Sequence, residues 1–157
     1  STGTGQNYLI ENVTISDAAQ DGIKVTGGGG TKTNVKVVNC TVDTARRHGI
    51  EFADDVTWGV IANNRVRNTN TTTSGAGIFV SSTTVAPTIP SASFISITGN
   101  VVDTAENGIR AQGHDITISG NTVSSATVDG IRLRVLDHHL LVFADVDFLP
   151  EALQHDP

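Results

Sequence analysis

The chain has 157 residues, a net charge of −6 at pH 7, and 38% hydrophobic but only 4% aromatic residues. This length suits one domain, and no apolar run approaches the roughly 18 residues of a membrane span. The acidic balance argues against a nucleic-acid partner, because such a surface is strongly basic. Abundant Gly, Thr, Ser, Asn, Val and Ile favour short strands and tight turns over helices.

A six-residue phrase recurs five times along the chain. Each copy begins and ends with an aliphatic residue, and the copies lie at residues 10–15, 37–42, 61–66, 97–102 and 118–123. Successive copies start 27, 24, 36 and 21 positions apart (10 to 37, 37 to 61, 61 to 97 and 97 to 118). A period in the twenties with loops of varying length indicates a solenoid. The framework of leucine-rich repeats and the 3.6-residue period of helical repeats are both missing.

Aligned positions within this phrase predict a bend and a ladder. The third position holds only Asn or Gly, which adopt a left-handed backbone most readily, so we expect φ > 0 there. That column consists of Asn12, Asn39, Asn63, Gly99 and Gly120. The fourth position ends in Asn64, Asn100 and Asn121, whose amides we expect to stack as a hydrogen-bonded ladder.

A second phrase, centred on Gly-Ile, follows each copy of the first. Its copies lie at residues 21–25, 48–52, 76–80, 107–111 and 129–133, and we expect the glycine to mark a turn. Stacking of the repeats predicts two inward columns, in which each buried side chain contributes about 1.5–3 kcal/mol. One column is Ile23, Ile50, Ile78, Ile109 and Ile131, and the other is Ile15, Val42, Val66, Val102 and Val123.

The residue after each isoleucine of the second phrase is expected to face outward, because neighbours in a strand alternate sides. This outward column is Lys24, Glu51, Phe79, Arg110 and Arg132. At about 4.8 Å per strand it makes a strip about 20 Å long, enough for several sugar units. Its cations suit uronate carboxylates or sulfates, and Phe79 offers a stacking face. The alternative is a solvated face with salt bridges, in which Glu51 lies between Lys24 and Arg110.

The densest chemical cluster is Arg-Arg-His-Gly-Ile-Glu at residues 46–51, at the edge of this strip. Removal of the C5 proton of a uronate needs a neutralised carboxylate and a base about 3 Å from the proton. Arg47 and Arg110 are the candidates to bind the carboxylate. His48 or Lys24 is the candidate base, and Glu51 would orient the group.

Further candidates concern substrate contact, hydrolysis and metal. The substrate-binding candidates are Arg46, Trp58, Phe79 and Arg132. Hydrolysis would need two carboxylates across a cleft, for which Glu51 with Asp54 or Asp55 is the compact group. Asp54 and Asp55 also offer oxygen ligands for Ca²⁺, with an ordinary acidic turn as the alternative.

The pattern over roughly residues 7–136 resembles the right-handed parallel β-helix of the pectin-lyase-like superfamily. The resemblance implies coils of three short strands, in a fold that hosts lyases, hydrolases, epimerases, phage tailspikes and non-catalytic surface proteins. Arg47, His48 and Gly49 are similar to an Arg-His-Gly-aromatic segment of alginate C5-epimerases, where His and Arg assist proton transfer. Ile50 departs from the aromatic, and neither the family's Asp-Pro-His-Glu motif nor its catalytic Tyr is visible.

Segments outside the phrases raise separate expectations. Insertions at residues 26–33, 67–77 and 81–93 are either walls of a ligand groove or variable surface loops. Residues 137–157 carry five of the 16 acidic residues and no Lys or Arg, so 11 acidic and 10 basic residues remain elsewhere. We expect this segment to cap the last coil or to mediate self-association, with sequence foreign to the repeat as the alternative.

We therefore expect an all-β, single-domain parallel β-helix of five to six coils at residues 1–136, followed by the non-repeat segment 137–157. The first functional hypothesis is a secreted or cell-surface module acting on or binding an acidic polysaccharide, most like a polyuronate lyase or C5-epimerase. The second is a non-catalytic adhesin, tailspike-like stalk or fragment of a larger enzyme. Catalysis needs the five catalytic candidates to share one groove, whereas a structural role predicts that they pair off or splay into solvent.

Overall fold

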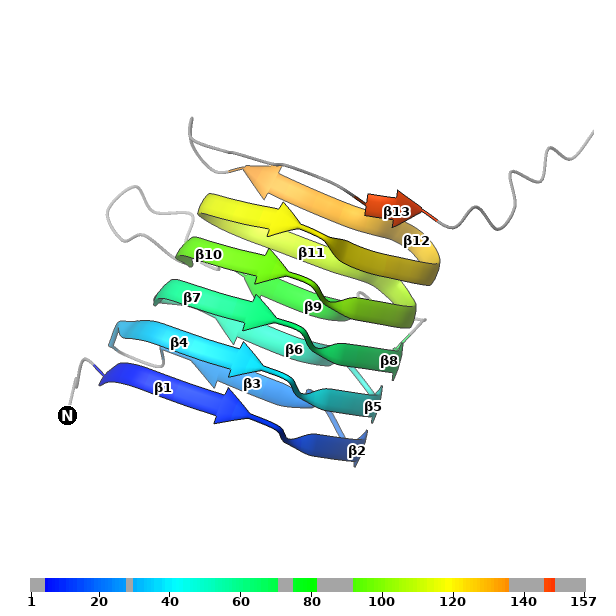
Figure 1. Ribbon diagram of the computed structural model, residues 1–157, viewed down its shortest axis with the longest axis horizontal. Helices are drawn as coiled ribbons and strands as arrows, with labels where there is room; N and C mark the ends of the chain where they lie inside the picture. Colours follow the sequence, from blue (N-terminus) through cyan, green and yellow to red (C-terminus); the bar gives the residue numbers. More distant parts are fainter. Residues whose placement is uncertain (1–4, 28–29, 71–74, 82–91, 136–145, 149–157) are drawn as a thin grey trace, which may run out of the picture.

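The protein is built from parallel strands, and no helix occurs among the residues that the computed structural model describes (Figure 1). These residues are 5–27, 30–70, 75–81, 92–135 and 146–148. Their strands belong to one 13-stranded sheet, which curls around a common core. The expected all-β class and its parallel strands are therefore confirmed.

The strands form three parallel ladders, which the chain visits in turn. The first contains β1 (Gly5–Glu11), β4 (Lys32–Val38), β7 (Val56–Ala62), β10 (Ser93–Thr98) and the end of β11 (Val101–Ser119). The second contains β2 (Thr14–Ala18), β5 (Thr41–Ala45), β8 (Arg65–Thr69), the starts of β11 and β12 (Asn121–Val135), and β13 (Val146–Phe148). The third contains β3 (Ile23–Thr26), β6 (His48–Ala53), β9 (Ala76–Ser81) and later parts of β11 and β12. In Figure 1, β4, β7 and β10 lie in front, with β3, β6 and β9 behind them.

Strand register confirms both predicted inner columns. In the third ladder the five isoleucines of the second phrase pair strand by strand, from Ile23 to Ile131. In the second ladder the column from Ile15 to Val123 pairs in the same way. The central members are fully buried, whereas Ile15 and Ile131 are only partly buried because each lies near one end of the stack.

Four of the five glycines of the second phrase lie inside strands, so the predicted turn is wrong there, whereas Gly22 lies in a bend directly before β3. Gly49 lies inside β6, and close packing explains it. A Cβ atom added there would lie 2.2 Å from Cγ1 of Val66 and 2.6 Å from the carbonyl oxygen of Gly77. The inner valine of the next repeat occupies the space that a side chain would need.

The predicted asparagine ladder is present and buried. Nδ2 of Asn64 donates to Oδ1 of Asn100 (3.0 Å), and Nδ2 of Asn100 donates to Oδ1 of Asn121 (2.9 Å). Each amide also donates to a backbone carbonyl of the preceding repeat, as Asn100 does to Ile61 (2.9 Å). Cys40 takes the ladder position one repeat earlier, where its amide donates to Oδ1 of Asn64 (2.8 Å). Each of these asparagines therefore ties neighbouring repeats together.

Left-handed backbone occurs in three columns, one of which was predicted. All five residues of the predicted Asn and Gly column have φ between 54° and 64°. A second column comprises Asp17, Thr44, Asn68, Thr104 and Ser125. A third, in the first ladder, comprises Asn7, Asn34, Trp58, Phe94 and Asp115. The additional columns include residue types that give no sequence signal for such a backbone.

Parts of the predicted insertions and of the final segment lie outside the described residues. Residues 28–29, 71–74 and 82–91 belong to those insertions, and residues 137–145 and 149–157 to the final segment. The described part of that segment, β13, pairs in parallel with β12 and adds a strand to the second ladder.

Candidate functional site

The predicted outward column is correct in register. Lys24 of β3 pairs with Glu51 of β6, which pairs with Phe79 of β9, and Arg110 and Arg132 follow on β11 and β12. One member is not open to solvent, because the Glu51 side chain is only 5% exposed. The strip therefore has a buried acid near one end and cations toward the other.

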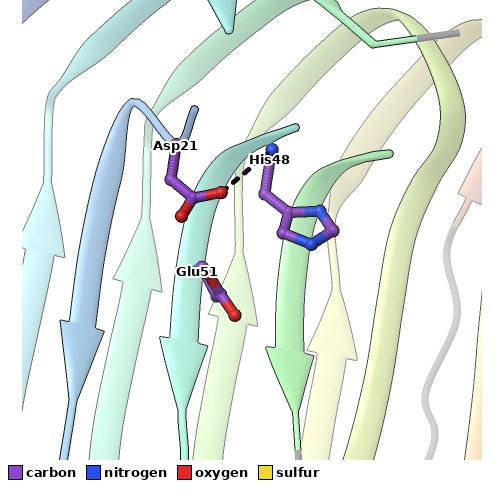
Figure 2. Close-up of side chains that lie close together, drawn as sticks. All are labelled: Asp21, His48 and Glu51. Carbon is purple, nitrogen blue, oxygen red and sulfur yellow. Dashed lines mark hydrogen bonds between the residues drawn. The ribbon is translucent and has the colours of Figure 1, made fainter. Parts of the chain in front are cut away.

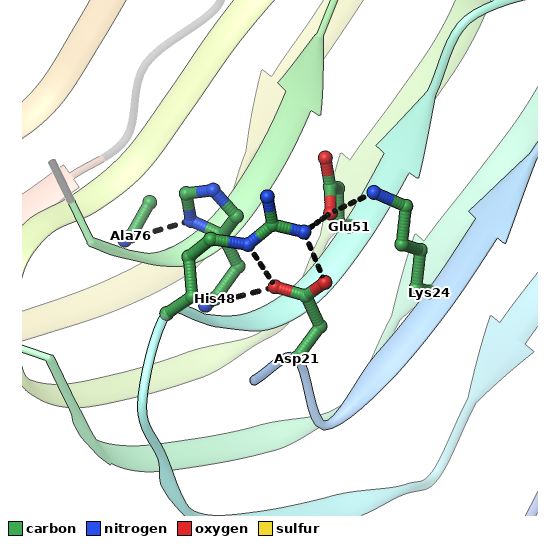
Figure 3. A network of polar contacts seen from close by, with 6 residues as sticks. Asp21, Lys24, His48, Glu51 and Ala76 are labelled. Carbon is green, nitrogen blue, oxygen red and sulfur yellow. Dashed lines mark hydrogen bonds and ion pairs between the residues drawn. The ribbon is translucent and has the colours of Figure 1, made fainter. Parts of the chain in front are cut away.

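Arg47 and Asp21 form the centre of a charge network at the buried end (Figure 3). Nε of Arg47 donates to Oδ1 of Asp21 (2.8 Å), and its Nη2 donates to Oδ2 of the same carboxylate. The same Nη2 lies 3.0 Å from Oε2 of Glu51, and Nζ of Lys24 also lies 3.0 Å from that oxygen. Two cations thus neutralise two carboxylates. The expected pairing of Glu51 with Lys24 occurs, but Arg47 takes the position expected for Arg110.

Asp21 and Glu51 have their pKa values pushed in opposite directions. Burial is the largest influence on Glu51 and raises the pKa of its carboxyl group above its ordinary value. Burial also acts to raise the pKa of Asp21, but the hydrogen bonds and charge of Arg47 outweigh it and hold that pKa below its usual value. Asp21 is therefore the more firmly ionised carboxylate of the pair.

His48 is buried beside this network (Figure 2). Its backbone N–H donates to Oδ1 of Asp21 (3.2 Å), and its ring lies against Phe79 with centroids 4.5 Å apart. Nδ1 accepts a hydrogen bond from the amide of Ala76 (3.1 Å), so the neutral ring carries its proton on Nε2. Burial, with the positive charges of Arg47, Arg110 and Lys24, lowers the pKa of His48 to about 4 despite the attraction of Asp21. At neutral pH the ring is an uncharged donor through Nε2.

Asp21, His48 and Glu51 are also the one group of three His, Cys, Asp or Glu residues among the described positions with ligand atoms close enough for a metal ion. Those atoms lie within 4.8 Å of one another. The donor set does not suit a cation, because Arg47 and Lys24 already neutralise the carboxylates and Nδ1 of His48 is occupied by an amide.

Asp54 and Asp55, the predicted Ca²⁺ ligands, lie in the turn between β6 and β7. Both have positive φ, and their carbonyl oxygens accept hydrogen bonds from the amides of Gly27 and Lys32. Within the described residues, no third His, Cys, Asp or Glu ligand joins them in a cluster. Neither belongs to the group of Asp21, His48 and Glu51, and the pairing of Glu51 with Asp54 or Asp55 for hydrolysis stays a prediction.

Arg110 and Arg132 make the open end of the strip. Cζ of Arg110 lies 5.0 Å from the centroid of the Phe79 ring, and its buried Nε has no hydrogen-bond partner among the described residues. Arg132 is more than half exposed and reaches Asp129 at 3.8 Å. Both arginines line a hollow of about 210 Å³ with Gln112, Ala111 and Leu133.

Two predicted substrate-binding residues lie elsewhere. Arg46 is exposed and lines a separate, open hollow of about 500 Å³ with Ala45, Asn68, Thr69, Asn70 and Thr104. Trp58 lies on β7 in the first ladder, where it stacks on Phe94. Phe79, by contrast, occupies the strip between His48 and Arg110, as its column position predicted.

Asp21 is the site residue that sequence reasoning missed. The sequence places it in the second phrase with no assigned role, although it holds Arg47 and the backbone of His48. Its signal was the column before each glycine, which comprises Asp21, His48, Ala76, Asn107 and Asp129. Register shows that members of this column stack on one another, as His48 does with Ala76.

No protein-family model, curated protein or solved structure matches this chain. The structure, over the residues it describes, contains no helix long and apolar enough to cross a membrane.

Proposed function

We propose that the chain is a right-handed parallel β-helix of five to six coils, of the pectin-lyase-like type, spanning residues 1–136. Three parallel ladders visited in turn, two continuous inner columns and the asparagine ladder support this architecture. The segment 137–157 caps the last coil or mediates self-association. The pairing of β13 with β12 supports the capping role.

We infer that its function is to bind an acidic polysaccharide at the Arg110–Arg132 end of the outward column. The observation that carries this proposal is a pair of neighbouring arginines lining one hollow. Arg110 stacks on Phe79, and no acidic partner of Arg110 occurs among the described residues. Within the part of the chain that the structure describes, Arg132 has only an exposed ion pair at 3.8 Å, a kind that contributes little. Two guanidinium groups at this spacing suit successive carboxylates or sulfates.

Binding is favoured over catalysis because the groups that a lyase needs are already engaged. Arg47 is held by Asp21 and Glu51, and Lys24 is held by Glu51, so neither is free to neutralise a substrate carboxylate. His48 presents a proton at Nε2 rather than a lone pair. Such a module suits an adhesin, a stalk or part of a larger enzyme, outside the cell or on its surface.

The experiment is calorimetric titration with polygalacturonate, alginate and a sulfated glycan at low and high salt. We expect binding that weakens with salt, and a loss of at least about tenfold in affinity for the Arg110→Gln/Arg132→Gln variant, since each charged contact contributes about 1.5–3 kcal/mol. Arg65→Gln is the matched control, because Arg65 is an exposed arginine on β8, away from the strip. Failure of the wild-type protein to bind any of these polymers would contradict the proposal.

A lyase or C5-epimerase is the second candidate, favoured by one specific observation. Four of the five catalytic candidates, Lys24, Arg47, His48 and Glu51, gather around one buried network rather than splaying into solvent. Absorbance near 235 nm during incubation with polyuronates, with and without Ca²⁺, tests elimination, and proton NMR tests epimerisation. A rise that His48→Ala abolishes would make catalysis the function.

A further inference from the structure

The first ladder carries a pair of exposed aromatic rings that the acidic-glycan site does not use. Trp58 of β7 and Phe94 of β10 stack with ring centroids 4.4 Å apart and planes 7° from parallel. The two residues are 58% and 45% exposed. Figure 1 shows β7 and β10 in front of β6 and β9, the strands that carry Glu51 and Phe79. The pair therefore lies on a different face from the strip.

The backbone at both rings is of a kind that bulky side chains rarely adopt. Trp58 and Phe94 each have φ near 55°, in the left-handed region. The other members of this column are Asn7, Asn34 and Asp115, residue types that accept this conformation readily. Burial in the core does not explain the aromatic choice, since both side chains are exposed and contact each other. Strained positions of this kind are often functional.

The charges around the pair differ from those of the strip. Neither β7, with sequence VTWGVIA, nor β10, with sequence SFISIT, contains a charged residue. The half-buried Thr57 precedes Trp58, and Asn34 and Asp115 are neighbours of the two rings along the column, whereas Ser93, which precedes Phe94, is buried. An aromatic surface among hydroxyl, amide and carboxylate groups complements a ligand with one apolar face and a rim of hydroxyl groups.

We propose that Trp58 and Phe94 form a second glycan contact, which binds a neutral pyranose ring. The C–H face of the sugar lies against the indole, and its hydroxyl groups face the polar neighbours in the column. A polyanion is disfavoured because β7 and β10 supply no cation and Asp115 lies in the same column as the rings. Lys36 of the adjacent β4 pairs with Val60 rather than with Trp58. A second copy of the chain is disfavoured because two side chains expose far less than the roughly 800 Å² per partner of a stable interface.

The test uses the fluorescence of Trp58, which is the sole tryptophan of the sequence. Neutral gluco-, manno-, galacto- and xylo-oligosaccharides are titrated into the full chain at concentrations up to about 10 mM, beyond the usual range of weak affinities. We expect a saturable change in emission with at least one of them. Phe94→Asn keeps the reporter and should weaken that ligand about tenfold, the effect of losing one stacking partner. Trp58→Asn should abolish the heat of binding in calorimetry.

Folding and the two glycan sites can be separated within the same experiment. Asparagine suits the left-handed backbone, so both variants should keep a cooperative thermal transition close to that of the wild type. Arg110→Gln/Arg132→Gln should leave the fluorescence response to neutral sugars unchanged, and added salt should have little effect on it. These controls keep a failure of this site distinct from a failure of the acidic-glycan proposal.

Three results would overturn the proposal. The first is no emission change with any neutral oligosaccharide, and the second is a response confined to acidic sugars. The third is an emission change that follows protein concentration alone, accompanied by a dimer in sedimentation velocity, which would assign the rings to a second copy of the chain.

Discussion

Two copies of the phrase Asp-Gly-Ile, at residues 21–23 and 129–131, occupy the same column of the repeat but hold their carboxylates differently. The Asp21 side chain is 5% exposed and forms an ion pair with Arg47. The Asp129 side chain is 42% exposed, and its ion pair with Arg132 is longer, at 3.8 Å. The difference comes from the neighbouring repeat. Arg47 and His48 cover Asp21, so identical local sequence produces a buried charge network at one end of the column and an open cationic surface at the other.

The largest expected effect is on stability and comes from removing the carboxylate of Asp21, the buried one of the two aspartates. Asp21→Ala leaves Nε of Arg47 and the His48 amide without their acceptor and leaves Arg47 only its contact with Glu51, so we expect a loss of about 3 kcal/mol in the free energy of unfolding. Chemical denaturation measures it. Asp129→Ala, the same change in the same phrase, should cost no more than about 0.5 kcal/mol because its ion pair is exposed. Equal losses of unfolding free energy in Asp21→Ala and Asp129→Ala would show that the two ends of the column do not differ in this way.

The second prediction concerns pH and the buried end. The pKa of His48 in the folded protein is about 4, below its ordinary value of 6.5, so the unfolded chain binds the extra proton between these values. Stability contributed by His48 is therefore complete above about pH 6.5 and falls by about 2–3 kcal/mol as the pH drops toward 4. Glu51 acts in the opposite sense, because a raised pKa favours the folded state at low pH.

His48→Asn isolates the histidine contribution to this pH dependence. An asparagine Oδ1 can accept the Ala76 amide hydrogen bond in place of Nδ1, but it does not titrate. The variant keeps Glu51, so the difference between its stability profile and that of the wild type measures His48. Parallel profiles between pH 4 and pH 6.5 would contradict the assigned direction.

Ligand affinity should depend on the Arg132 end of the outward column, whereas the free energy of unfolding depends more on the buried end at Asp21. Arg132→Gln should weaken an acidic polysaccharide about tenfold, whereas Lys24→Gln should change affinity less than about twofold because Lys24 is already paired with Glu51. Both substitutions remove one positive charge, so their net-charge effects are matched. Calorimetry at fixed ionic strength compares them. A larger loss of affinity for Lys24→Gln than for Arg132→Gln would show that the ligand binds at the Lys24 end of the column.

The smallest expected effect is an increase in affinity for the ligand. Asp129→Asn removes the weak partner of Arg132 and should raise affinity for a polyanion by about twofold, as expected for a surface ion pair. Asp43→Asn, which frees Arg67 on the second ladder, is the matched control and should leave affinity unchanged. An unchanged affinity in Asp129→Asn would mean that Asp129 does not compete with the ligand.

The repeat made much of the fold predictable, and the site only in part. Inner columns, the asparagine ladder and the outward column follow from aligned positions, because a parallel register stacks equivalent residues. The burial of Glu51 did not follow, since it depends on where the long side chains of Lys24 and Arg47 turn. Asp21 was missed because an Asp before Gly is common in turns. The left-handed backbone of Trp58 and Phe94 had no signal in their residue types.

The asparagine ladder also bears on how such a chain can change in length. Asn100 accepts from Asn64 and donates to Asn121, so every rung uses the same donor and acceptor on its two sides. If one whole repeat were removed or duplicated, the ladder asparagines on either side could still hydrogen-bond to each other. The stacked columns would remain continuous. Removal of a single residue from a strand would instead turn its inner side chains outward. Whole repeats are therefore the natural unit of insertion and deletion, which makes the protein extensible in steps of one layer.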